Sequence, residues 1–365
     1  MTDTEQVHTL TTNCLSIKKA YFDEVILPVF KQITEKIIPA EKYYRIAGRN
    51  ICLRFYNDDL SENLKYALSH NEIDKPSRID LTVHLWDTVS THAQFTAPWI
   101  NKNYFFTQST ETKNKATDNF MGVYLYGEET LTLYDRDRKT AYFWTHDAKL
   151  LPVWVSAAPI RTLLQWFLAE TGVYLVHGAV IGCNGKAALI TARGGSGKST
   201  TALASVLSGM TYLGDDYVGI ESTDTITAHS LYNSVKVSPS YVAKFLNLSP
   251  YVWNKEGEKS VLFLAPLFPQ QVLKNSPLSA ILIPVIKHHK KSVIVPATKA
   301  QAMLALMPTT LFQLPLVAAN KIQILKKIIE KTPCYSIELS SDSDEVASAI
   351  SGFLESSLFS QTDKK

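Results

Sequence analysis

Residues 177–216 read HGAVIGCNGKAALITARGGSGKSTTALASVLSGMTYLGDD, and they carry the strongest structural signal in the chain. A short apolar stretch at 186–191 leads into GGSGKST at 194–200, and an amphipathic stretch follows at 199–208. This order of strand, glycine-rich loop and helix is typical of a phosphate-binding loop (P-loop). The sequence therefore predicts an α/β fold for this part of the chain.

The loop residues are expected to bind the phosphates of a nucleotide. Glycines allow the backbone to turn tightly, so that successive N–H groups point into one concavity at the positive end of the helix. The lysine would reach the β- and γ-phosphates, and the hydroxyl after it would coordinate Mg²⁺. The residues are Gly194, Gly195, Ser196, Gly197, Lys198, Ser199 and Thr200. We therefore expect ATP and Mg²⁺ as cofactors, although such a loop recognises phosphates and does not distinguish ATP from GTP.

One position departs from the full pattern G-x-x-x-x-G-K-[ST], because Ala192 replaces its first glycine. Alanine is the smallest substitute and is harmful only if the residue needs a positive φ angle. A glycine- and serine-rich turn that binds no nucleotide is the alternative. The strand and the helix on either side of the loop favour the nucleotide site.

Two adjacent carboxylates, Asp215 and Asp216, follow the apolar stretch at 211–213. Parallel strands direct their carboxyl ends to the edge of the sheet where the phosphate loop lies, so we expect both side chains beside the nucleotide. One carboxylate can hold Mg²⁺ while the other takes the proton from an attacking hydroxyl. The alternative is an ordinary acidic turn.

His177 lies on an apolar stretch that precedes the loop strand. A lone histidine is more often a core residue than a catalytic one, and this alternative stays open. Its functional role would be to orient a catalytic aspartate or to assist proton transfer. We therefore take His177, Lys198 and one of the two aspartates as the catalytic candidates.

The order of His177, residues 194–199 and the pair Asp215 and Asp216 resembles the HPr kinase/phosphorylase family, whose fold the phosphoenolpyruvate carboxykinases share. The resemblance covers about residues 173–222. It implies a P-loop kinase core of that type. It also implies that His177 and Asp215 take part in proton transfer, and that Ser199 and Asp216 hold Mg²⁺.

Downstream of the loop, the chain is atypical and departs from the pattern of that family. It contains no E-x-R-G sequence and no arginine after Arg193. Any cation that this part of the chain offers to a phosphate must therefore be a lysine, and Lys236 and Lys259 are the candidates. These departures argue against HPr itself as the substrate.

The favoured function is an ATP-dependent kinase that transfers the γ-phosphoryl group to a hydroxyl acceptor, either a serine of a protein or peptide or a small alcohol. The alternative is a nucleotide-binding switch, or a degenerate kinase with a recognition role. A carboxykinase-like enzyme on the same fold is a third hypothesis, and its substrate-binding arginine would have to come from before residue 194.

Composition excludes several other classes. The 365 residues include 37 Lys and Arg against 34 Asp and Glu, a net charge of +3 that is too balanced for nucleic-acid binding or a polybasic membrane contact. No apolar stretch approaches the roughly 20 residues of a membrane span. We find no signal peptide, and the four cysteines are widely separated, so we expect reduced thiols and a cytoplasmic protein. The tryptophans are expected to be core or interface anchors, because no basic stripe accompanies them.

We expect two domains, a β-rich α+β domain at 1–150 and the P-loop domain at 151–365. The first has no catalytic motif and is assigned to recognition or oligomerisation, so a homo-oligomer is allowed. Its strands are predicted by the alternation at 79–85 and by three β-like stretches. Those stretches are 120–126, 130–134 and 140–144. At the start of the second domain, Ser156 is expected to cap a helix whose apolar face runs from Ile160 to Leu168.

Overall fold

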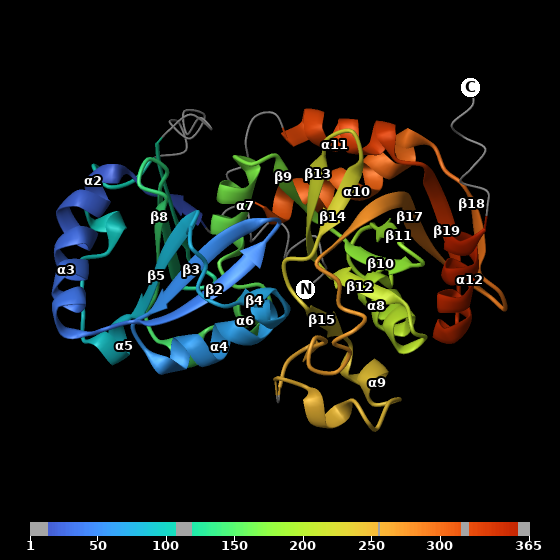
Figure 1. The fold of residues 1–365 in the computed structure, drawn as a ribbon, viewed down its shortest axis with the longest axis horizontal. Helices are drawn as coiled ribbons and strands as arrows, with labels where there is room; N and C mark the ends of the chain where they lie inside the picture. Colours follow the sequence, from blue (N-terminus) through green and yellow to red (C-terminus); the bar gives the residue numbers. More distant parts are fainter. Residues whose placement is uncertain (1–13, 107–118, 255, 315–320, 357–365) are drawn as a thin grey trace. The chain divides into compact units, whose positions relative to one another are not determined.

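The computed structural model describes residues 14–106, 119–254, 256–314 and 321–356 (Figure 1). The chain divides into two compact units, residues 1–167 with 312–319 and residues 168–311 with 320–365. The division falls inside helix α7 (Arg161–Ala169). The fold is mixed α/β with a large mixed sheet in each unit, and no helix among the described residues is long and apolar enough to cross a membrane. The boundary at residue 150 and the roles of the two domains stay predictions.

The N-terminal unit is built on a sheet of eight strands within the described residues, in the order β1-β6-β7-β8-β5-β3-β2-β4. Strand β5 runs parallel to both β3 and β8, whereas β7 runs antiparallel to β6 and β8. The strands are β1 (Cys14–Ser16), β2 (Ala40–Ile46), β3 (Arg49–Phe55), β4 (Glu72–Ile73), β5 (Leu81–Asp87), β6 (Phe120–Leu125), β7 (Thr130–Asp135) and β8 (Thr140–Thr145). The four predicted strands are confirmed as β5 to β8, and β5 begins at Leu81 rather than at residue 79.

Short helices complete the N-terminal unit. They are α2 (Lys19–Tyr21), the π-helix η1 (Phe22–Ile26), α3 (Leu27–Lys36), α4 (Asp58–Leu68), α5 (Thr88–Thr91) and α6 (Val153–Ala157). The residues of η1 and α3 pack an aromatic core against the sheet, where Phe22 lies 4.9 Å and Phe30 5.1 Å from the ring centre of Tyr142. Stacked and edge-on rings of this kind stabilise a core beyond their buried area.

The predicted start of the helix after Ser156 is wrong. Ser156 lies inside α6, and α7 begins only at Arg161. The physical reason is Pro159, because a residue before proline is pushed out of the helical region. Ala158 accordingly has φ −141° and ψ 68°, and Ile160 has a left-handed φ of 46°. The chain therefore stops and restarts its helix here.

The C-terminal unit holds the second sheet, in which β9-β13-β14-β17-β11-β10-β12 form one path and β19 and β18 continue from β17. The strands of this unit, including the separate pair β15 and β16, are β9 (Val173–His177), β10 (Ala179–Cys183), β11 (Lys186–Ile190), β12 (Thr211–Gly214), β13 (Tyr217–Ser222), β14 (Ile226–His229), β15 (Ser234–Val237), β16 (Ser260–Phe263), β17 (Asn275–His289), β18 (Val293–Pro296) and β19 (Cys334–Ser340). The helices are α8 (Lys198–Leu207), α9 (Pro239–Val242), α10 (Lys299–Gln313), α11 (Lys321–Lys331) and α12 (Ser343–Glu355).

Both faces of this sheet are covered by helices (Figure 1). Along β11, Ala188 and Ile190 join one buried cluster with residues of α8 and α12, while Ala187 and Leu189 join another with residues of α10 and α11. A strand buried on both faces needs apolar residues at successive positions, which explains the continuous apolar run before the loop.

The strand directions bring two chain segments to one edge of the sheet. Both β11 and β12 pair antiparallel with β10, so they run parallel to each other. The glycine-rich loop leaves the carboxyl end of β11, and Asp215 follows the carboxyl end of β12. The expected convergence at one edge is therefore present in the backbone.

Candidate functional site

The loop between β11 and α8 owes its shape to two glycines. Gly195 and Gly197 have φ angles of 75° and 90°, a left-handed conformation that side chains other than glycine adopt at a cost. Ala192 does not have a positive φ. Its methyl group is buried without the strain that would have excluded alanine, so the departure from the motif is compatible with this loop.

Two polar side chains face the inside of this loop. The Lys198 ammonium is buried and donates to the backbone oxygens of Ala192 at 2.9 Å and of Arg193 at 3.1 Å. The Ser196 hydroxyl is buried and has no hydrogen-bond partner within the described residues. An unsatisfied buried hydroxyl is rare in proteins and calls for an explanation such as a ligand. The loop therefore has the shape and the free donor that a phosphate requires.

Asp215 faces the first turn of α8. The Ser199 hydroxyl donates to Oδ1 of Asp215 at 3.0 Å, and the backbone N–H of Lys236 donates to Oδ2 at 3.2 Å. Burial and the neighbouring charge of Asp216 raise the pKa of the Asp215 carboxyl to about 7. A hydroxyl and a carboxylate in contact at the end of a phosphate loop are oxygen ligands of the kind that Mg²⁺ prefers.

The Asp216 carboxylate contacts a different set of residues from the Asp215 carboxylate. Its carboxylate forms an ion pair with the Lys236 ammonium, and it lies 3.5 Å from Nε2 of His177. Burial alone would raise the pKa of Asp216, but Lys236 and His177 hold it well below its usual range. The residue also has a left-handed φ of 63°, a conformation that aspartate tolerates better than most residues and that is frequent at functional sites.

His177 is buried at the end of β9. Burial lowers the pKa of its imidazole, so the ring is neutral near pH 7, and its Nδ1 has no partner within the described residues. The adjacent Gly178 donates its N–H to the backbone oxygen of Asp216 at 3.1 Å. A Cβ at Gly178 would lie 2.8 Å from the backbone oxygen of Ile190. Only glycine at this position lets His177 approach the loop strand so closely.

The structure pairs these side chains differently from the assignment that the family resemblance implies. That assignment groups His177 with Asp215 and Ser199 with Asp216, whereas the observed contacts join Ser199 to Asp215 and His177 to Asp216. Asp216 has a left-handed φ of 63°, and the two consecutive carboxylates have different partners. Sequence spacing alone does not contain this information.

The remaining candidates fall inside or outside this cluster. Gly194 lies exposed in the loop and Thr200 lies in the first turn of α8. Of the two candidate lysines, Lys236 on β15 contacts both aspartates, whereas Lys259 is exposed before β16. The absence of arginine after Arg193 was the sequence signal that pointed to these lysines, and Arg193 itself is exposed.

The described residues fit a nucleotide-bound metal better than a metal held by the protein alone. They contain no group of three or more His, Cys, Asp and Glu side chains that could hold an ion. Ser199 and Asp215 supply two oxygens, and Mg²⁺ commonly takes its other ligands from phosphates and water. The site therefore suits Mg²⁺ that enters together with a nucleotide.

Comparisons with known proteins add little to this picture. No protein-family model matches the chain, and no curated protein matches it. Among solved structures, the Hpr(Ser) kinase/phosphatase from Coxiella burnetii is similar at 9% identity and a TM-score of 0.29, over 49% of this chain and 87% of that one. A likeness this weak does not establish a shared fold, so the functional argument rests on the residues of the site.

Proposed function

We propose that this chain is an ATP-dependent phosphotransferase that acts on a hydroxyl group, either a serine in a protein or peptide or a small alcohol. The observation that carries the proposal is the hydrogen bond between Ser199 and Asp215 beside a second carboxylate, Asp216. The second carboxylate, held by His177, favours a proton transfer and therefore a reaction.

Nucleotide binding would use the loop and α8. The backbone N–H groups of the loop, the Ser196 hydroxyl and the Lys198 ammonium are the donors for phosphate oxygens. When bound, ATP with Mg²⁺ supplies the γ-phosphoryl group that is transferred. The carbonyls of Ala192 and Arg193 hold the ammonium at the loop, so its charge is positioned before a phosphate arrives.

Ser199 and Asp215 are the residues that we assign to Mg²⁺. A carboxyl group binds a metal in its ionised form, and the raised pKa of Asp215 means that this carboxyl is only partly ionised near pH 7. A cation beside it stabilises the carboxylate form and lowers that pKa. Metal and nucleotide binding are therefore expected to release a proton from Asp215.

Asp216 is the residue that we assign to the proton of the attacking hydroxyl. Its carboxylate is ionised, and Nε2 of His177 orients it from a distance of 3.5 Å. In the same contact, Lys236 weakens the carboxylate as a base, because it stabilises the ionised form. A phosphate that draws the ammonium of Lys236 toward itself would make Asp216 more basic and would place a cation on the transferred group.

The experiment measures nucleotide binding by the full chain with Mg²⁺, and formation of the nucleoside diphosphate, which is ADP when ATP is supplied and GDP when GTP is supplied. We compare the wild type with Lys198→Ala and with Lys259→Ala, which removes an exposed lysine outside the site. Loss of a charged hydrogen bond costs about 1.5–3 kcal/mol, so Lys198→Ala should weaken binding by about 10-fold to 100-fold, and Lys259→Ala should not. Equal affinity of Lys198→Ala and wild type would refute the phosphate site.

The same measurement separates a transferase from a switch. ADP formation that increases when hydroxyl acceptors are supplied, and that requires Asp216, supports phosphoryl transfer. Tight binding without ADP formation under any condition would favour the switch.

A further inference from the structure

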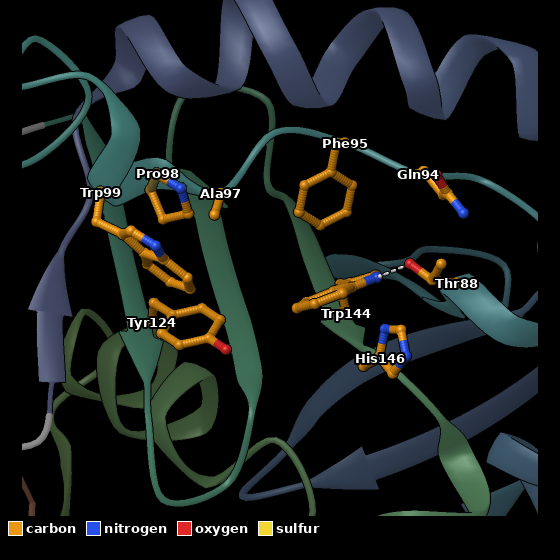
Figure 2. Close-up of a pocket in the computed structure, with 9 residues that line it drawn as sticks. All are labelled: Thr88, Gln94, Phe95, Ala97, Pro98, Trp99, Tyr124, Trp144 and His146. Atoms are coloured by element: carbon orange, nitrogen blue, oxygen red, sulfur yellow. Dashed lines mark hydrogen bonds between the residues drawn. The ribbon is translucent and has the colours of Figure 1, made fainter.

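A cavity of about 250 Å³ lies in the N-terminal unit, apart from every residue of the site above (Figure 2). Strands β5 and β6 both run in the direction of β8, since β5 pairs with it in parallel and β6 is related to it through two antiparallel pairings. Their carboxyl ends therefore meet at one edge of the sheet, and the segment that follows β5 passes over it. Ligands bind preferentially in crevices at the carboxyl ends of such strands.

Aromatic rings form the walls of this cavity. The ring centres of Trp99 and Tyr124 are 5.2 Å apart, and those of Phe95 and Trp144 are 4.7 Å apart. The indole N–H of Trp144 donates to the Thr88 hydroxyl at 2.9 Å, which fixes the orientation of its ring (Figure 2). Tyr124 and Trp144 are buried, whereas Trp99 is 46% exposed. The cavity thus has rigid inner walls and one accessible ring at its rim.

The lining carries no Asp, Glu, Lys or Arg. The lining residues are Thr88, Gln94, Phe95, Ala97, Pro98, Trp99, Tyr124, Trp144 and His146. The Thr88 hydroxyl is already used, because it accepts from Trp144 and donates to the backbone oxygen of Ala93 at 3.1 Å. Gln94 and His146 are both exposed. The walls therefore offer π faces for stacking and no charged side chain that could pair with an ionic ligand.

We propose that this cavity binds an uncharged planar aromatic group of one or two fused rings. An apolar cavity of about 150 Å³ is large enough for benzene, so about 250 Å³ leaves room for an indole. Edge-to-face and offset contacts with Trp99, Tyr124 and Trp144 supply the attraction. The group belongs either to a free small molecule or to a side chain of a peptide, and the proposal does not depend on the function assigned to the other unit.

The test uses the full chain labelled with 5-fluorotryptophan and followed by fluorine NMR. The probes are indole and the blocked tripeptide Gly-Trp-Gly, with methyl glucoside and tetramethylammonium as the uncharged polar and cationic comparisons. We expect saturable shifts of the Trp99 and Trp144 signals on addition of indole, and no shift of Trp86, which is fully buried outside the lining. Saturation by the tripeptide as well identifies a side chain as an acceptable source, and saturation by indole alone identifies a free small molecule.

Matched variants make the test specific. Trp99→Ala should weaken indole binding by about tenfold, and Trp99→Phe, which keeps a ring, should retain most of it. Trp154→Ala is the control, because Trp154 is 47% exposed, like Trp99, and does not line the cavity. The unchanged Trp86 signal reports that each variant is folded. The proposal is overturned if indole does not saturate the Trp99 signal, if Trp99→Ala binds as wild type does, or if only methyl glucoside or tetramethylammonium binds.

Discussion

Asp215 should make metal-dependent nucleotide binding sensitive to pH near neutrality. Its carboxyl has a pKa of about 7 because it is buried beside Asp216. With that pKa, about one tenth of the carboxyl is ionised at pH 6 and about nine tenths at pH 8. Since a carboxyl group binds a metal in its ionised form, the affinity for the Mg²⁺ complex of ATP should rise about tenfold from pH 6 to pH 8.

The assay is isothermal titration calorimetry at pH 6, 7 and 8 with Mg²⁺, for wild type and Asp215→Asn. The phosphates of ATP also titrate in this range, so the variant serves as the reference for the nucleotide's own pH dependence. The asparagine can still accept the hydrogen bond from Ser199 but cannot be ionised. We expect the additional tenfold rise in the wild type alone.

Two results would refute this reasoning. The first is the same pH dependence in wild type and Asp215→Asn, which would mean that the carboxyl does not titrate near pH 7 or does not meet the metal. The second is a pH dependence that Asp215→Asn keeps and Asp216→Asn loses, which would assign the metal to Asp216.

Three further predictions concern single residues. Asp216→Asn should keep nucleotide affinity within a few-fold and slow phosphoryl transfer by about 10²-fold to 10⁴-fold, the usual contribution of a general base, and steady-state kinetics will separate the two effects. Gly197→Ala should lower the free energy of unfolding by about 1–2 kcal/mol and should weaken nucleotide binding. The reason is that the φ angle of Gly197 is 90° and that the new methyl group would lie 3.3 Å from the Leu339 side chain. Denaturant titrations measure the change in stability, and Gly352→Ala, where the new methyl group would meet no atom within 4 Å, is the control. Lys321→Met should raise the melting temperature at pH 7, because Lys321 is buried without a hydrogen-bond partner in the described residues and burial lowers its pKa to about 7. An amine whose pKa is lowered in the folded state costs stability once the pH falls below its ordinary pKa of about 10.5, and the cost grows until the pH reaches about 7. The gain in melting temperature from Lys321→Met should therefore be smaller near pH 10.5 than at pH 7. Equal gains at both pH values would contradict this account.

The sequence predicted the strand, the glycine-rich loop and the following helix well because their signals are local. One short segment contains the apolar run of β11, the glycines with left-handed φ angles and the start of α8. The residue types alone indicate each of these three features. The convergence of Asp215 on the loop followed from strand direction alone. Composition also pointed to Lys236, together with Lys259, through the lack of arginine after Arg193.

The features that the sequence missed depend on single backbone angles or on distant contacts. Pro159 divides the helix expected after Ser156, although the apolar spacing continues across the break. The contacts of Asp215 with Ser199 and of Asp216 with His177 differ from the expected pairing of these side chains. Among the tryptophans, Trp86 is a core residue as expected, but Trp99 is half exposed at the rim of a cavity. Nothing in the spacing of these residues separates the two cases.

Lys236 gives the two carboxylates a common dependence on one residue. Its backbone N–H meets Asp215 and its ammonium meets Asp216, and it lies on the β15–β16 pair, which is not part of the main sheet. A displacement of this ribbon removes a stabilising donor from both carboxylates in one movement, and the basicity of both rises together. An acceptor that shifts the ribbon on binding would thereby change the basicity of the proposed metal ligand and of the proposed base together, with no change in the glycine-rich loop.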